Sequence, residues 1–205
     1  MKLNIKTIAA IFVLLPLTIL TSSAFAIPNG SKAPEFTLIS VEGKAISLKD
    51  YAGKMIVLEW FNYGCPFVRK QYKDGFMQSL QKEVVEKSGV WLTINSTEPQ
   101  HKNFLTPEKA KAVSEELKMN NTAMLTDVSG EVGKLYNAKT TPHMFLIDVN
   151  GNIVYQGAFD DKPDAFDGPE GATNYVRNAI ADLKEGRAVK VSDTEAYGCS
   201  VKYKE

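Results

Sequence analysis

The sequence predicts one α/β domain with a mixed central sheet and helices on both faces. The chain has 205 residues, a length typical of one domain. Strand-like apolar runs alternate with segments of helical periodicity along most of it, as α/β folds require. Turn signals such as Asn150-Gly151 lie between apolar runs and indicate hairpins, so antiparallel strands join parallel ones.

Residues 1–26 have the three-part pattern of a secretory signal peptide. Lys2 and Lys6 are followed by an apolar run from Thr7 to Leu20, and Ala24-Phe25-Ala26 supplies a small-residue cleavage site. The run is short for a spanning helix, which needs about 20 residues. We therefore expect an exported protein, periplasmic or secreted, with no membrane span after cleavage, in a compartment where disulfides persist.

The first half of the remaining chain predicts a hairpin, two strands and one long helix. A nearly continuous apolar run over residues 55–61 is typical of a strand covered on both faces. Apolar residues near helical spacing predict a helix over residues 66–87. The other expected elements are strands at 36–39 and 45–48 around Glu42-Gly43, and a strand at 90–94.

The second half predicts further helices and a second hairpin. Thr106-Pro107 supplies an N-cap and a first-turn proline for a helix that runs to about residue 119. Gly186 ends a helix over 173–185. We expect residues 27–190 to form the domain, followed by a tail, 191–205, with little periodicity. The remaining elements are a strand at 123–126, a helix at 132–136, and strands at 144–148 and 153–156.

Composition excludes several classes of function. Lys plus Arg and Asp plus Glu are both 24, so no basic excess indicates a nucleic-acid partner. The chain has only 2 Cys and 2 His, which leaves few ligands for a conventional zinc site, since such a site needs four closely placed nitrogen or sulfur donors. We expect no metal, no cofactor and no nucleic acid.

Cys65 is the strongest candidate for a catalytic residue. It lies where the apolar strand ends and a helix begins, and Pro66 suits the first position of that helix, which leaves Cys65 near the N-cap. The helix dipole and free N–H groups at that position favour a thiolate, and Arg69, four residues on, adds positive charge. The alternative is a buried, inert cysteine.

Two motifs resemble the peroxiredoxin-like redoxin branch of the thioredoxin superfamily, which includes the alkyl hydroperoxide reductase and thiol-specific antioxidant proteins. The first runs from Leu48 to Phe61 and leads into Cys65-Pro66. The second is Thr140-Thr141-Pro142-His143 with the apolar run after it. The resemblance covers roughly residues 31–157 and implies a thioredoxin-like fold, a cis peptide at Thr141-Pro142 beside Cys65, and thiol redox chemistry.

The resemblance also suggests roles for site residues. It implies that Gly64, Pro66, Thr141 and Pro142 line the substrate pocket. The sequence departs from the related families at other positions. Val68 replaces the second cysteine of a C-x-x-C pair, Asn62 replaces the usual Thr or Ser, and no Arg lies near Pro142. Asn62 and Arg69 are expected to take over as electrostatic helpers.

Three roles are possible for Cys199, which lies in the tail. It can be a resolving thiol that closes a disulfide with Cys65 during turnover. It can form a static disulfide with Cys65 that ties down the tail. It can also pair with another copy of the chain.

We expect an exported thiol oxidoreductase of peroxiredoxin-like type. Its substrate is a peroxide or a protein disulfide, and an unidentified thiol reductant regenerates it. The alternatives are a protein thiol–disulfide oxidoreductase without peroxidase activity, and a non-enzymatic module with a structural Cys65–Cys199 bond.

Overall fold

The computed structural model describes residues 27–164, 168 and 170–204. The predicted signal peptide, residues 1–26, lies outside the described residues. Within the described part of the chain, no helix is both long and apolar enough to cross a membrane.

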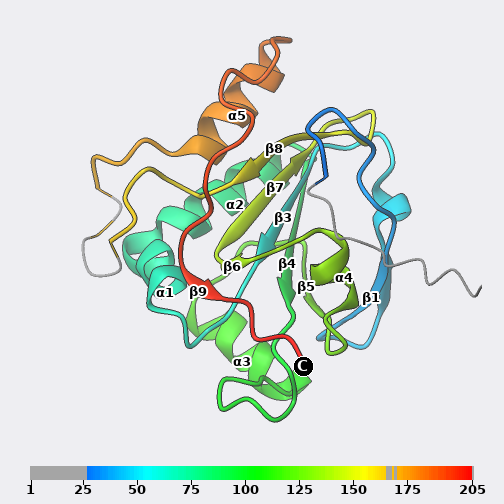
Figure 1. The fold of residues 1–205 in the computed structure, drawn as a ribbon, viewed down its shortest axis with the longest axis vertical. Helices are drawn as coiled ribbons and strands as arrows, with labels where there is room; N and C mark the ends of the chain where they lie inside the picture. The colour runs from blue at the N-terminus through cyan, green and yellow to red at the C-terminus, as the bar shows by residue number, and fades with distance from the viewer. Residues whose placement is uncertain (1–26, 165–167, 169, 205) are drawn as a thin grey trace, which may run out of the picture.

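A seven-stranded mixed sheet forms the centre of the molecule (Figure 1). The strand order is β2-β1-β5-β4-β3-β7-β8, in which β3, β4 and β5 are parallel and the other neighbours are antiparallel. A separate two-stranded sheet pairs β6 with β9. The strands are β1 Thr37–Ser40, β2 Ala45–Ser47, β3 Ile56–Trp60, β4 Val90–Asn95, β5 Ala123–Thr126, β6 Thr140–Thr141, β7 His143–Ile147, β8 Ile153–Gly157 and β9 Cys199–Ser200.

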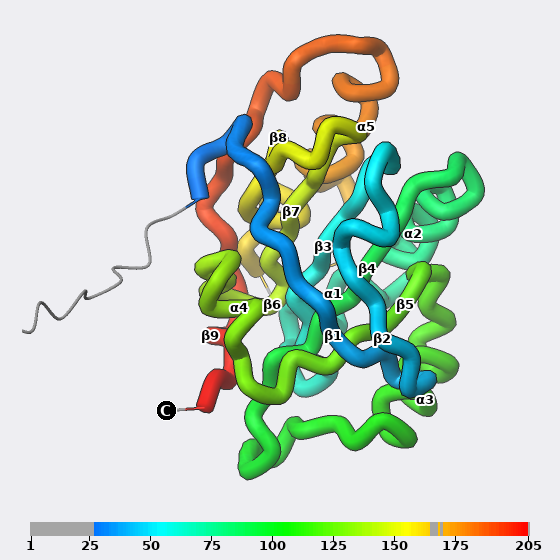
Figure 2. The backbone as a smooth tube through the Cα atoms, turned by 90° about the vertical axis from the view of Figure 1, so that its right-hand side faces the viewer, coloured from blue at the N-terminus to red at the C-terminus, as the bar shows by residue number. Residues whose placement is uncertain are grey.

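Helices cover both faces of the sheet, as predicted. One hydrophobic core joins the sheet to α1, α2, α3 and α5, and a second joins it to α4 and the 3-10 helix η1. Figure 2 shows α4 and α2 on opposite sides of the strands. Strand β3 is buried throughout and contributes alternate side chains to the two cores. The helices are η1 Leu48–Tyr51, α1 Pro66–Tyr72, α2 Phe76–Glu86, α3 Pro107–Glu116, α4 Glu131–Leu135 and α5 Tyr175–Lys184.

The single helix predicted over residues 66–87 is wrong, because the chain breaks it in the middle. A short 3-10 turn, η2 Lys73–Gly75, separates α1 from α2. Asp74 has φ 61° and Gly75 has φ 81°, and two such residues in succession end an α-helix. The apolar spacing hid the break, since α2 again buries Met77, Leu80 and Val84.

The tail is more ordered than its sequence suggested. Residues 187–204 run down one side of the molecule, in red in Figure 1, from the end of α5 past β8 to β6 and then to the C-terminus. The prediction of little periodicity was wrong for the last part. Tyr197, Cys199, Val201 and Tyr203 alternate with small or polar residues, the period of a strand.

Candidate active site around Cys65

Cys65 is the N-cap of α1, and Pro66 occupies the first helical position, as predicted. The backbone turns sharply between the end of β3 and this helix, and the Cys65 N–H donates to the Asn62 carbonyl at 3.0 Å. The Cys65 side chain is only 1% exposed. The sulfur therefore sits at the helix N-terminus but is covered by other residues, which limits its access to solvent.

The Thr141 carbonyl lies directly against the Cys65 sulfur. The Cys65 thiol donates to this oxygen at 3.0 Å. The peptide bond between Thr141 and Pro142 is cis, as the resemblance implied. These three residues come from α1 and from the β6–β7 segment, so the structure brings together two motifs that lie far apart in the sequence.

Cys199 meets Cys65 across strand β6. Cys199 is the register partner of Thr141 in the antiparallel β6–β9 pair. Both cysteines are free thiols. Burial, and then the hydrogen bond and charge of the adjacent Cys65, raise the pKa of Cys199 to about 11. The two thiols are thus neighbours, and the raised pKa means that Cys199 becomes a thiolate only at high pH.

Asn62 shapes the turn that presents Cys65. Its Oδ1 accepts from the Gly64 N–H at 2.9 Å, and its Nδ2 donates to Thr97 Oγ1 at 3.3 Å. Gly64 lies against Asn103, where an added Cβ would come within 2.1 Å of the amide nitrogen. The amide of Asn62 is therefore engaged by the turn itself.

Arg69 lies on the exposed side of α1. Its guanidinium carbon is 5.8 Å from the centroid of the Tyr63 ring, and Tyr63 in turn donates to Glu116 at 2.8 Å. Pro66 is also exposed. The roles of Arg69, Asn62, Gly64 and Pro66 remain predictions.

Tyr197 ties the tail to the helix that Cys65 begins. Its hydroxyl donates to Asp160, and Gln71 Nε2 donates both to Asp160 at 2.7 Å and to the Tyr197 oxygen at 3.3 Å. Its ring meets Phe67 edge-on at 5.9 Å. This contact was not predicted from the sequence, where the strand-like alternation that ends at Tyr203 is the only signal for it.

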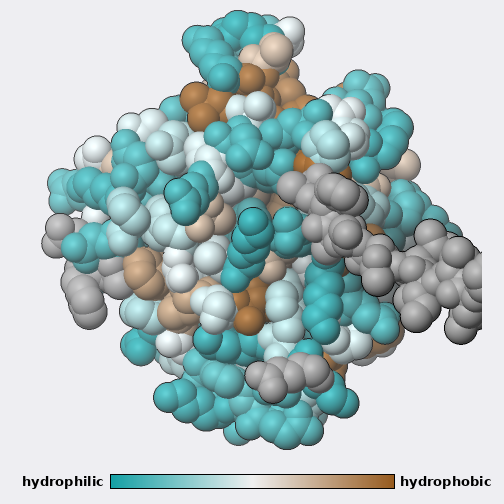
Figure 3. Space-filling model, in the orientation of Figure 1, coloured by the Kyte–Doolittle hydropathy of each residue, from teal (hydrophilic) through white to brown (hydrophobic). Residues whose placement is uncertain are grey.

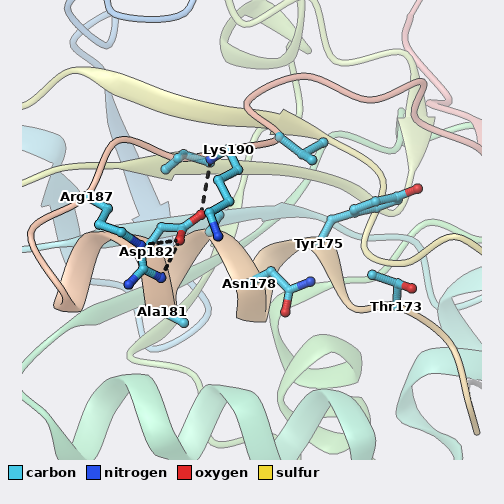
Figure 4. A pocket seen from close by; sticks show the side chains of 10 residues that line it. Thr173, Tyr175, Asn178, Ala181, Asp182, Arg187 and Lys190 are labelled. Carbon is cyan, nitrogen blue, oxygen red and sulfur yellow. Dashed lines mark hydrogen bonds and ion pairs between the residues drawn. The ribbon is translucent and has the colours of Figure 1, made fainter.

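The chain is also held where it leaves α5 and the tail begins. A cleft lies there between α5 and residues 187–191 (Figure 4). Asp182 accepts from Arg187 Nη2 at 2.7 Å and from the Lys190 N–H at 3.1 Å. The hydrogen bond from Arg187 lowers the pKa of Asp182. These bonds fix the direction in which the chain leaves α5.

A buried carboxylate, Glu59, lies in β3, six positions before Cys65. It accepts from Trp91 Nε1 at 2.8 Å and from the Tyr72 hydroxyl at 3.0 Å, with Thr93 and Gln81 also donating. Burial raises the pKa of Glu59 to about 7, against the lowering effect of these hydrogen bonds. The surrounding run predicted only an apolar strand, and nothing in it pointed to this residue.

With this geometry established, comparison with known proteins identifies the family. Residues 29–156, more than half of the chain, match the AhpC/TSA family. The chain belongs to the AhpC/TSA family. The prediction of a redoxin-type member of the thioredoxin superfamily is confirmed, and with it the prediction of a thiol oxidoreductase.

Curated relatives of this AhpC/TSA-family chain include thiol-disulfide oxidoreductases named ResA. The protein of Bacillus thuringiensis subsp. konkukian is 30% identical over 129 residues, which span 62% of this chain and 68% of the relative. The protein of Geobacillus thermodenitrificans is 32% identical over 130 residues, again 62% and 68%.

Solved structures agree with the fold. An uncharacterized conserved protein from Geobacillus kaustophilus matches with a TM-score of 0.76 and 30% identity, over 86% of this chain and 93% of that one. The thioredoxin domain of a thiol-disulfide oxidoreductase from Bacteroides vulgatus matches with a TM-score of 0.52 and 24% identity, over 64% and 89%. The predicted thioredoxin-like fold is confirmed.

Proposed function

We propose that this protein is an exported thiol–disulfide oxidoreductase in which Cys65 attacks a substrate disulfide and Cys199 resolves the product. The observation that carries the proposal is the meeting of the two thiols across β6, with Cys199 opposite Thr141 and the Cys65 sulfur 3.0 Å from the Thr141 oxygen. Export is inferred from the signal-peptide pattern of residues 1–26.

The cycle balances with two thiols and one disulfide. The Cys65 thiolate attacks one substrate sulfur, forms a mixed disulfide and releases the other sulfur as a thiolate, which takes a proton. The Cys199 thiolate then attacks the Cys65 sulfur, forms the Cys65–Cys199 disulfide and releases the second substrate thiolate. The substrate gains two electrons, and a separate thiol reductant must return two electrons to the protein.

Peroxide reduction is the second candidate, because the chain belongs to the AhpC/TSA family. Here the Cys65 thiolate takes one peroxide oxygen to become a sulfenic acid and releases an alcohol or water; Cys199 then condenses with the sulfenic acid and water leaves. Two contacts favour disulfide exchange instead. The amide of Asn62 is held by Gly64 and Thr97, and the guanidinium of Arg69 lies over Tyr63.

The test treats the reduced protein with one equivalent of hydrogen peroxide or of a small disulfide and follows thiols and mass. We expect the disulfide to convert both thiols to the intramolecular Cys65–Cys199 bond faster than peroxide does. Cys199→Ser should stop at a mixed disulfide on Cys65, and Cys65→Ser should lose the reaction. Retained reaction in Cys65→Ser would overturn the proposal, as would a Cys65–Cys199 bond that resists excess dithiol.

A further inference from the structure

We propose that the docked tail, residues 194–203, is a size filter over Cys65, which admits small disulfides or peroxides and excludes protein disulfides until it undocks, and that the Tyr197 side chain is one of the contacts that keep the part next to Cys199 docked. The inference rests on the proposed function in one respect, that Cys65 is the reactive thiol.

The tail covers the sulfur from the side of β6. Cys65 is 1% exposed, although the loop before it, at Gly64, is open to solvent. Gly198 approaches so closely that an added Cβ would lie 2.1 Å from the Thr141 oxygen, the atom that accepts from the Cys65 thiol. In Figure 3 the surface on this side is mostly hydrophilic, with a small hydrophobic area where β9 and α1 lie in Figure 1.

The tail also occupies the backbone edge that an extended protein segment would use. Strand β9 pairs with β6 in antiparallel register, and the Val201 N–H donates to the Lys139 carbonyl at 3.0 Å. A protein disulfide carried on an extended segment would reach Cys65 by adding a strand to the same edge. Because only one strand can pair there, such a substrate competes with the tail, whereas a small molecule does not need the edge.

Asp160 is the centre of the contact that holds the tail. Its side chain is buried, and its Oδ1 accepts from the Tyr197 hydroxyl and from the Lys162 N–H, the second at 3.0 Å. Gln71 donates to the other oxygen at 2.7 Å, and Lys70 Nζ lies 3.7 Å from Oδ1 with both side chains 1% exposed. Hydrogen bonds to a buried charged group are the stronger kind, so the Tyr197 hydroxyl contributes more than an exposed one would.

Separate anchors lie on each side of Tyr197. Before it, Thr194 Oγ1 accepts from the Ala158 N–H at 2.9 Å and bonds the Tyr155 hydroxyl at 2.7 Å. After it, the Tyr203 hydroxyl donates to the Ala138 carbonyl at 2.7 Å. Loss of the Tyr197 hydroxyl therefore leaves the middle of the tail, which carries Cys199, held mainly by the short β6–β9 pair, while the two ends stay attached.

The test measures access to Cys65 directly. In a Cys199→Ser background Cys65 is the only cysteine, since the chain has 2. Its alkylation rate is measured with N-ethylmaleimide and with the same maleimide on a long polyethylene glycol chain, each normalised to the rate in denaturant. Tyr197→Phe keeps the ring and removes the hydroxyl. Tyr136→Phe is the matched control, because it removes a buried hydroxyl that bonds Pro34, away from the tail.

We expect the polyethylene glycol reagent to react more slowly than N-ethylmaleimide in the parent protein. Tyr197→Phe should raise its rate about tenfold, the effect of one hydrogen bond to a charged group, and change the N-ethylmaleimide rate much less. Tyr136→Phe should leave both rates unchanged. Equal normalised rates in the parent protein, or a ratio unchanged by Tyr197→Phe, would overturn the inference.

A second variant reaches the same conclusion by another route. Gly198→Ala must push β9 away from the Thr141 carbonyl, and at φ 136° an alanine is strained as well. Gly43→Ala, at φ 80° with nothing within 4 Å, carries the strain without the contact. Gly198→Ala should raise the alkylation rate of the large reagent, and Gly43→Ala should not. An unchanged rate in Gly198→Ala, or an equal increase in Gly43→Ala, would count against the filter.

The two proposals fail separately. Alkylation needs no turnover, so a filter that appears in the alkylation rates of a protein without oxidoreductase activity would leave the inference standing and remove the proposed function. A protein that turns over a small disulfide, but is alkylated by both reagents at equal normalised rates, would support the proposed function and overturn the size filter.

Discussion

The thiol of Cys199 has a raised pKa. Burial is the largest cause of the raised pKa of Cys199, about 11 against an ordinary value of 9.0, and the neighbouring Cys65 adds to it. In a mixed disulfide Cys65 carries no charge, so its contribution falls while the effect of burial stays. The resolving thiol is therefore mostly protonated at neutral pH.

We predict that the resolving step accelerates about tenfold per pH unit between pH 7 and 9, because each unit increases the thiolate fraction of Cys199 by that factor. The measurement is the decay of the Cys65 mixed disulfide, trapped with acid and resolved by mass. A pH-independent decay would show that Cys199 is not the attacking group in the slow step. Cys199→Ser, whose mixed disulfide should persist at every pH, is the control.

Gly64 leads to a second prediction at this scale. An alanine at this position would bring its Cβ to 2.1 Å from Asn103 Nδ2 and 2.3 Å from Asn103 Cγ. Because the clash reaches the branch carbon, Asn103 must move as a whole. Gly64→Ala should lower the free energy of unfolding by about 1–3 kcal/mol, as overpacking does.

The double variant Gly64→Ala/Asn103→Ala isolates this contact. It should be less destabilised than the sum of the two single variants, in a denaturant-unfolding cycle. Strict additivity would mean that the turn at Gly64 is limited by its backbone and not by Asn103.

At the scale of elements, Glu59 places a titrating carboxylate between β3 and the α1–α2 helices. Its pKa is about 7 in the folded protein against 4.5 ordinarily. Between these values the unfolded chain loses its proton while the folded chain keeps it. The free energy of unfolding should therefore fall as the pH rises from 4.5 to 7, by on the order of 3 kcal/mol.

Glu59→Gln tests this slope. His143 titrates in the opposite sense over a similar interval, since burial lowers its pKa to about 4 and stability is lost as the pH falls. The variant keeps His143, so the difference between the two stability–pH curves isolates Glu59. We expect Glu59→Gln to be less stable throughout, because its amide faces hydrogen-bond donors, and to lack the fall between pH 4.5 and 7. Parallel stability–pH curves for the two proteins would refute the assignment of this slope to Glu59.

Local pattern decides which of these elements the sequence predicts. The apolar run of β3, the proline after Cys65 and the Asn150-Gly151 turn are short-range signals, and each lies where it was expected. The Asp74–Gly75 break was hidden because side-chain spacing continues across it. The β6–β9 pair joins residues at 140–141 and 199–200, two residues a strand, and so short and distant a pairing leaves almost no local trace.

The candidate site divides in the same way. Cys65 could be found from its neighbours in sequence, whereas Tyr197, Gln71 and Asp160 come from three separate segments and meet only in the fold. Gln71 and Asp160 are of residue types usually found on the surface, so their burial could not be predicted from the sequence. Glu59 was missed because a lone carboxylate within an apolar run gives no indication of its four donors.

For the whole molecule, a Cys65–Cys199 disulfide would close a loop that contains most of the domain, whereas both cysteines are free in this structure. A cross-link over more than 100 residues stabilises by as much as about 4.7 kcal/mol in the chain-entropy model. In the reduced protein the tail is already docked at Thr194, Tyr197 and Tyr203. The disulfide therefore adds constraint mainly in the unfolded state, which is where that model places its effect.

That stabilisation separates a catalytic disulfide from a static one. The difference in unfolding free energy between the oxidised and reduced proteins is linked to the reduction potential of the pair, with 30 mV equal to about 1.4 kcal/mol. A turnover disulfide must be reducible by the thiol reductant that completes the cycle, so we predict a potential above about −300 mV and a stabilisation well below the full loop-closure value. Equilibrium with a dithiol–disulfide buffer gives the first quantity, and denaturant unfolding of both forms gives the second. A potential below about −300 mV together with the full stabilisation would identify a static disulfide that only anchors the tail, and would contradict the two-thiol cycle.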